Sequence, residues 1–143
     1  MSKSYISPSL RRRVSDRANH SCEYCLIPEA LSLSSHHVDH IIAEKHGGHT
    51  TPENLALSRS LCNQTKGSDI ASIDPNTAET VRLYNPRKDI WTEHFTLEVA
   101  TGLIQPQTAI GRVTAKLLRI NRLESLPVRQ LLAKIGYIPS KKT

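Results

Sequence analysis

The chain has 143 residues, a formal net charge of +6 and a pI near 9.5. This length suits one domain with a modest core, so we expect residues 1–143 to form a single domain. No segment approaches the roughly 18 apolar residues of a membrane span, and the first residues lack the apolar core of a signal peptide. These features argue against membrane and secreted classes and predict a cytoplasmic protein, while the positive charge predicts a polyanionic partner.

The first element that the pattern predicts is a helix beginning at Ser7-Pro8. Leu10, Val14 and Ala18 follow at helical spacing. The triplet at residues 11–13 consists of arginines that fall on or around the opposite side. Such a triplet either faces solvent or contacts nucleic-acid phosphate, and the sequence leaves both open.

Residues 22–25 form a Cys-x-x-Cys knuckle, a spacing that binds zinc in reducing compartments. Cys62 is the only other cysteine, and an odd count without a secretory signal argues against a disulfide framework. Two outcomes are open. Cys22, Cys25 and Cys62 hold a structural Zn²⁺ with a fourth ligand from His20, His46 or water, or they form a buried thiol cluster without metal. Residues 26–33 predict a turn followed by a first strand.

The next stretch predicts the order strand, loop, strand, helix. Residues 38–42 alternate as a strand does, Gly47-Gly48 supplies a turn, and residues 55–57 form the returning strand. A short helix then carries Asn63 and Lys66, with Ser58 or Ser60 as its N-cap and Gly67 at its end.

Asp39 and His40 are neighbours on the first strand, so their side chains leave in opposite directions. Asp39 and the amide oxygen of Asn63 are ligands that suit a hard divalent cation. Histidine is a common general base, so His40 is suited to take a proton from an attacking water. His37 shares a strand face with Asp39, where it either binds the ion or packs beside it.

Asp39-His40, Gly47-Gly48, Asn54-Leu55, Asn63 and Lys66-Gly67 together resemble the signature of the HNH endonucleases, also called ββα-metal or His-Me finger nucleases. In the variant seen here Asp replaces the first His and Asn replaces the last. Many members carry a second Cys-x-x-Cys before the helical Asn, but Arg59 stands where the partner of Cys62 would be.

The resemblance implies an α+β fold with a ββα-metal, treble-clef-like finger at about residues 20–70. An N-terminal helix precedes the finger, and an extension of strands and helices follows from about 71 to 143. It also implies His40 as general base, and Asp39 and Asn63 as ligands of one divalent cation, Mg²⁺ or Mn²⁺, Ni²⁺ or Zn²⁺. Asn54 would orient the His40 backbone.

In the extension, residues 72–77 predict a turn, and residues 79–84 and 96–99 predict strands. Helices are expected at residues 105–121 and 126–135. Trp91 and Phe95 predict core packing. The tail, with Asn85-Pro86-Arg87 and Trp91-x-x-His94-Phe95, is similar to one that follows the nuclease core in a bacterial subgroup of the family.

The candidate nucleic-acid contacts are basic residues of the finger and of the first long helix of the extension: Arg59, Lys66, Arg112, Lys116 and Arg119. A solvated helix face explains the last three equally well. The sequence favours a metal-dependent endonuclease that hydrolyses DNA, with double-stranded DNA as the expected substrate. The alternatives are a non-catalytic DNA-binding zinc-knuckle module and an RNA-directed nuclease.

Overall fold

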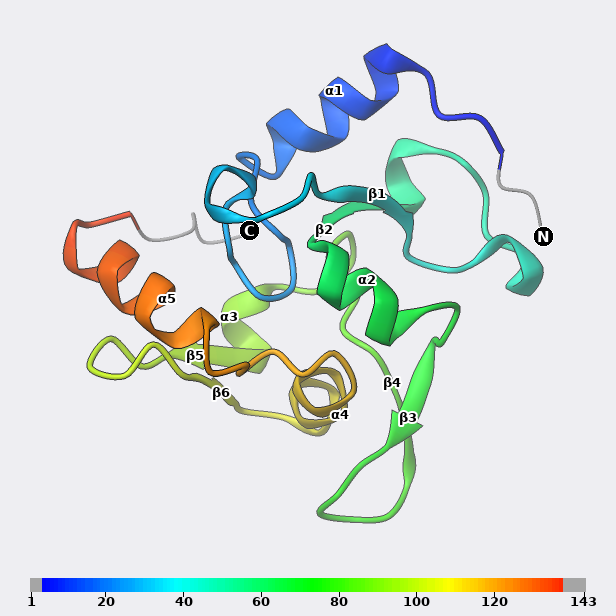
Figure 1. Cartoon of the computed structure of the whole chain (residues 1–143). Helices are drawn as coiled ribbons and strands as arrows, with labels where there is room; N and C mark the ends of the chain where they lie inside the picture. Colours follow the sequence, from blue (N-terminus) through cyan, green and yellow to red (C-terminus); the bar gives the residue numbers. More distant parts are fainter. Residues whose placement is uncertain (1–3, 138–143) are drawn as a thin grey trace.

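The computed structural model describes residues 4–137 and has an α+β fold. Helix α1 (Pro8–Arg17) lies against a central hairpin of β1 (His37–His40) and β2 (Leu55–Ser58), which helix α2 (Ser60–Lys66) follows (Figure 1). The extension then forms two hairpins and three helices: β3 (Ala71–Ile73), β4 (Thr80–Arg82), α3 (Trp91–His94), β5 (Phe95–Leu97), β6 (Ile104–Pro106), α4 (Ala109–Leu117) and α5 (Ser125–Lys134). Each sheet has two antiparallel strands.

The central hairpin pairs Asp39 with Ala56 and His40 with Leu55. Strand β1 ends at His40, two residues earlier than predicted. The reason is that Asn54 accepts the hydrogen bonds of the next two backbone N–H groups. Ile41 N donates to Asn54 O at 2.8 Å, and Ile42 N donates to Asn54 Oδ1 at 2.9 Å. The hairpin is therefore closed at this end by a side chain.

Helix α1 begins as predicted, because the Ser7 hydroxyl accepts a hydrogen bond from Leu10 N at 3.2 Å. Val14 and Ala18 pack against Val38, Leu55 and Leu57 in a small core of their own. The arginines at residues 11–13 are exposed. Their role as phosphate contacts stays a prediction.

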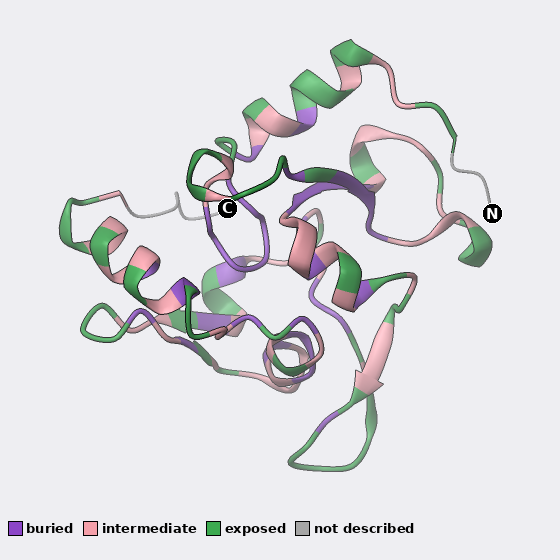
Figure 2. Cartoon of the chain, viewed as in Figure 1, coloured by how far each residue is buried: buried purple, intermediate pink, exposed green. Residues whose placement is uncertain are grey.

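The larger core joins the knuckle to the extension. Figure 2 shows buried residues concentrated in the central hairpin and in the loop that carries the knuckle. Trp91 and Phe95 are buried in this core, as predicted. The Trp91 indole donates to Tyr24 O at 3.2 Å, and Tyr84 packs edge-on against the Tyr24 ring.

Several predicted elements differ from the structure. The strand expected in residues 26–33 is absent from that segment, which forms a short 3-10 helix, Glu29–Leu31, after the loop closes through an isolated bridge between Ser21 and Pro28. The helix predicted from 105 begins at Ala109, since residues 104–106 pair with β5 and Thr108 caps the helix. Residues 71–73, assigned in part to a turn, form β3.

Helix α2 differs at its start. Its N-cap is Arg59, whose side chain makes no capping bond, and neither Ser58 nor Ser60 takes that position. Gly67 ends the helix with a positive φ of 52°, as predicted. No helix within residues 4–137 is long and apolar enough to span a membrane.

Candidate active site

His40 is buried, with 4% of its surface exposed, and is held by one ring nitrogen. Its Nε2 lies 2.8 Å from Thr50 Oγ1 in the loop between β1 and β2. Nδ1 has no hydrogen bond among the described residues, yet it is not one of their fully buried polar atoms without a partner. Nδ1 is therefore the ring nitrogen that solvent or a substrate can reach.

Asp39 faces helix α2. Lys66 Nζ donates to Asp39 Oδ2 at 3.1 Å and to the backbone oxygen of His40 at 3.2 Å. Both side chains of this ion pair are almost fully buried. The structure holds the Lys66 ammonium inside the protein with a carboxylate partner, and the phosphate contact predicted for Lys66 stays a prediction.

The side chains of Asp39 and His40 were predicted to point in opposite directions. Their hydrogen-bond partners agree with this, since the partner of Asp39 lies on α2 and the partner of His40 lies in the loop. Asp39 Oδ1 has no bond to a described residue and is not among the buried unpartnered atoms. It is thus open to a cation. Asn63 is half-buried on α2, one turn before Lys66. Its side-chain amide atoms likewise have no bond to a described residue and are not among the buried unpartnered atoms.

These open oxygens pass a simple test of donor chemistry. A carboxylate oxygen and an amide oxygen are both hard donors, and Mg²⁺ commonly uses one or two protein oxygens together with water and phosphate. The site therefore fits a hard divalent cation. His37 is exposed, whereas Asp39 is buried.

Asn54 holds the loop that runs between the strands. Its Oδ1 accepts from Ile42 N, and its Nδ2 donates to Ile42 O and to His49 O, each at 2.9 Å. The expected contact with the His40 backbone is replaced by contacts to Ile42, two residues later. Gly48 is required here, because a Cβ at this position would meet Ile42 O at 1.7 Å.

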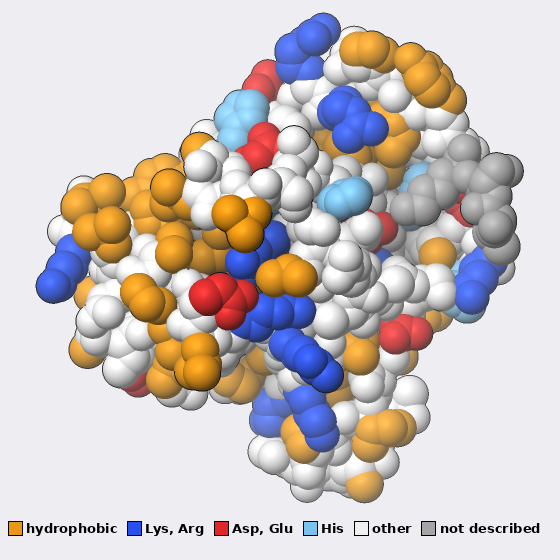
Figure 3. All heavy atoms as spheres, viewed as in Figure 1, with side chains coloured by type: hydrophobic (Ala, Val, Ile, Leu, Met, Phe, Trp, Pro, Cys, Tyr) orange, Lys and Arg blue, Asp and Glu red, His pale blue; other side chains and the backbone are white. Residues whose placement is uncertain are grey.

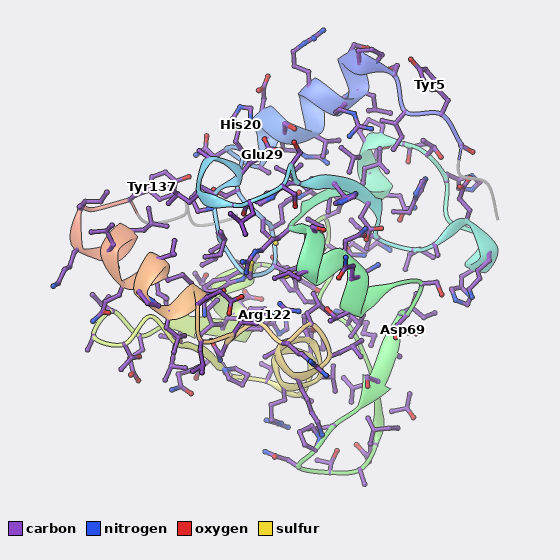
Figure 4. The ribbon with its side chains drawn as sticks, in the orientation of Figure 1. Tyr5, His20, Glu29, Asp69, Arg122 and Tyr137 are labelled. Carbon is purple, nitrogen blue, oxygen red and sulfur yellow. The ribbon has the colours of Figure 1, made fainter. Side chains whose placement is uncertain are left out.

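The second cluster of possible ligands consists of Cys22, Cys25 and Cys62, called here the Cys cluster. Their sulfur atoms lie within 4.8 Å of one another, and all three residues are buried. No other His, Cys, Asp or Glu among the described residues joins them. His20 instead pairs with Asp16 at 3.2 Å on the exposed end of α1 (Figure 4), and His46 is exposed.

The thiols of the Cys cluster share hydrogen bonds. Burial raises the pKa of Cys22 to about 11. Hydrogen bonds with Cys22 and Cys62 lower the pKa of Cys25 well below its usual value, whereas hydrogen bonds with Cys22 and Cys25 raise the pKa of Cys62. Without metal, Cys25 is the favoured thiolate of the three.

A structural zinc site normally has four protein ligands. The Cys cluster offers three. The Arg59 guanidinium turns away to Ser125 Oγ at 2.9 Å and to Glu124 at 3.6 Å. The cluster can bind a metal, but its ligand set does not fit a closed structural zinc site.

Three side chains of the extension hold the knuckle directly. Arg87 forms a buried ion pair with Glu23, the Trp91 indole donates to Tyr24 O, and Arg129 donates to Cys25 O at 3.1 Å. Arg129 is 1% exposed, and its other bonds go to Gly102 O, Ile120 O and Asn121 Oδ1. No carboxylate bonds to it within residues 4–137, and burial lowers the pKa of its guanidinium.

Two further predicted nucleic-acid contacts are occupied within the protein. Arg59 is tied to α5, as described above. Arg112 forms two 2.9 Å bonds to the buried Asp74 and holds the pKa of that carboxyl below its usual range. Lys116 and Arg119 are exposed, and no ion pair of theirs is found in the described part of the chain.

Sequence reasoning missed the roles of Thr50 and Arg129. Thr50 is a small polar residue in a turn-rich loop, where such residues are ordinary. Arg129 is an arginine in a predicted amphipathic helix, where the default is a solvated position. Neither type of residue signals its partner when that partner is far away in the sequence.

The hairpin, the trailing helix and the paired acidic and imidazole groups define a ββα-metal finger. Residues 22–69 match the family model described as HNH endonuclease. The family indicates a nuclease or DNA-binding function that acts on nucleic acid. Comparison with curated proteins and with solved structures gives no match.

Proposed function

We propose that this protein is a metal-dependent endonuclease that hydrolyses phosphodiester bonds of DNA, with double-stranded DNA as the preferred substrate. The observation that carries the proposal is the set of open atoms around one hairpin end: His40 Nδ1, Asp39 Oδ1 and the Asn63 amide. A retained scaffold without chemistry has no need to keep a base and two hard donors without partners inside the protein.

In the proposed reaction, His40 Nδ1 accepts a proton from a water molecule. The water oxygen forms a bond to phosphorus while the bond from phosphorus to the 3′-oxygen breaks, which leaves a 5′-phosphate. A divalent cation bound through Asp39 and Asn63 would stabilise the charge on the phosphate and on the leaving oxygen. Asn54 keeps the loop beside His40 in place, because it bonds both ends of that loop.

The test of the chemistry is His40→Ala. We expect cleavage to fall by about 10² or more because the general base is lost, while DNA binding persists. Supercoiled plasmid, single-stranded DNA and RNA would be incubated with each protein in Mg²⁺, Mn²⁺ and Ni²⁺, and the ends of the product analysed. His37→Ala, which changes an exposed neighbour, is the control.

Wild-type protein that binds DNA and cleaves nothing would support the non-catalytic module instead. Cleavage of RNA but not of DNA would show that RNA, rather than DNA, is the substrate. Equal cleavage by His40→Ala and wild type would remove His40 from the mechanism.

The proposed DNA surface includes the exposed side of α4 and the turn that follows it. Figure 3 shows Lys and Arg side chains running in a row from the centre of this face toward the β3–β4 hairpin, over the region where Figure 1 draws α4. Lys116 and Arg119 are exposed there. Arg122, on the segment between α4 and α5 (Figure 4), reaches Leu61 O on α2 and so links this surface to the finger.

Reversing the charges of Lys116 and Arg119 to Glu should weaken DNA binding and reduce the slope of its salt dependence by about one per lost phosphate contact. Fluorescence anisotropy with a short duplex over a range of NaCl concentrations measures both. Lys134→Glu, at the end of α5, is a matched exposed control. Affinity that does not change would remove α4 from the interface.

A further inference from the structure

Thr50 is the only described residue whose side chain bonds to the His40 ring. Its Oγ1 lies 2.8 Å from Nε2, and the ring itself is buried. Nothing in the signature of the finger points to this position, which lies between the glycine pair and Asn54. The contact joins the candidate base to the loop rather than to the strand that carries it.

The loop places the Thr50 hydroxyl through its neighbour. Asn54 Nδ2 donates to the backbone oxygen of His49, which directly precedes Thr50, while the same side chain holds Ile42 at the start of the loop. Gly48 N also donates to Ala43 O at 3.1 Å, and Gly48 lies against Ile42 O with no room for a Cβ. The path from Asn54 to Thr50 is therefore fixed at both ends.

A neutral imidazole carries its proton on one nitrogen and offers a lone pair on the other. The direction of the hydrogen bond at one nitrogen therefore decides which nitrogen can act as a base. The Thr50 hydroxyl can accept from Nε2–H or donate to a bare Nε2, and only the first arrangement frees Nδ1. If Nε2–H donates to Thr50 Oγ1, the lone pair is on Nδ1, the nitrogen that is open to solvent. The opposite tautomer would place a proton where the base is needed.

We propose that Thr50 is a positioning residue that holds His40 in the Nε2–H tautomer and aims Nδ1 at the substrate. The proposal deepens the nuclease function proposed above and rests on it for its effect on rate. The tautomer itself is a property of the folded protein and does not depend on activity. Asn54 then acts one step further away, by placing the hydroxyl that Thr50 presents.

The experiment compares Thr50→Val, which keeps the shape but removes the hydroxyl, with Thr50→Ser, which keeps the hydroxyl. Thr51→Val is the control, since this neighbour makes no side-chain capping bond. The first readout is the ¹⁵N chemical shifts of the His40 ring in metal-free protein, at one fixed pH where the ring is neutral. The second is kcat and KM for DNA cleavage.

We expect Thr50→Val to lose the excess of the Nε2–H tautomer and to lower kcat about 10-fold or more, with little change in KM. Thr50→Ser should restore both, and Thr51→Val should resemble wild type. Wild-type shifts in Thr50→Val, or a failure of Ser to rescue, would overturn the proposal. A tautomer that depends on Thr50 in a protein without nuclease activity would uphold the positioning of the ring and reject the proposed function.

Discussion

The Cys cluster and the Asp39–His40 site are built by the same helix yet differ in access. Cys62 and Asn63 are consecutive on α2, but Cys62 is fully buried with two other thiols, whereas Asn63 is half-buried with open amide atoms. One face of this short helix thus contributes to a sealed thiol cluster, and the next residue presents an accessible amide. Sealing suits a structural role, and open donor atoms suit chemistry.

The two sites also differ in what their cationic neighbours do. At the Cys cluster, Arg59 and Arg129 bond to the extension and to backbone oxygens, so they connect distant segments. At the Asp39–His40 site, Lys66 bonds to the candidate ligand itself. Cationic side chains therefore connect distant segments at the Cys cluster, whereas at the Asp39–His40 site the Lys66 ammonium balances the charge of the candidate metal ligand Asp39.

The largest expected effect concerns the fourth position of the Cys cluster. Arg59→Cys should bind about one zinc per chain, as a four-thiolate site does, and its thermal stability should fall steeply when a chelator is added, because zinc binding then contributes to folding. Mass spectrometry of metal content and thermal unfolding with and without chelator measure both effects.

Arg59→Ser is the matched control, since it removes the same guanidinium without adding a thiol. Wild type is expected to hold well under one zinc per chain and to unfold at the same temperature with a chelator present. A full zinc equivalent in wild type would break the distinction between the two sites, because both would then be metal sites.

The next effect concerns the buried pair beside the open site. Lys66→Met should lower the free energy of unfolding by about 3–5 kcal/mol in the presence of a chelator, because it leaves the Asp39 carboxylate buried without its partner. Added Mg²⁺ should recover part of this loss if a cation binds Asp39. Urea unfolding with chelator and with Mg²⁺ measures both values.

Arg112→Met is the matched control for an ion pair far from the open site. Its effect should be smaller, since the Arg112 side chain is 27% exposed against 2% for Lys66, and Asp74 keeps bonds from Asn76 N and Thr77 Oγ1. Arg112 lowers the pKa of Asp74, so the stabilisation is present above the usual carboxyl pKa and is lost as the pH falls. The Arg112→Met variant should therefore lose less stability on acidification than wild type.

Equal effects of Lys66→Met and Arg112→Met, with no response to Mg²⁺, would show that Asp39 does not hold a cation.

The sequence predicted the finger better than the extension for physical reasons. Alternation at residues 38–42 and a glycine at 67 are local signals, and both elements formed close to the expected bounds. Residues 104–106 joined a strand instead of the predicted helix because their partner, β5, lies in a separate segment. Pairing of this kind is set by tertiary context rather than by propensity.

The candidate site shows the same division. The residue types at 39, 40, 54 and 63 were found from their spacing, and their catalytic and ligand roles stay predictions. The partners of Lys66, Arg59 and Arg112 were not found, since an exposed helix face and a buried ion pair look alike in one sequence. Burial decides which basic residues are available to a substrate, and burial depends on the whole fold.

The bond from Arg129 to Cys25 joins residues 104 positions apart in the chain. Contacts of such long sequence separation form late, because the intervening loop must be ordered first. During synthesis, therefore, residue 129 must leave the ribosome before residue 25 can receive its arginine partner. The knuckle is made early in translation, yet it obtains its full set of hydrogen bonds only after α5 has been made.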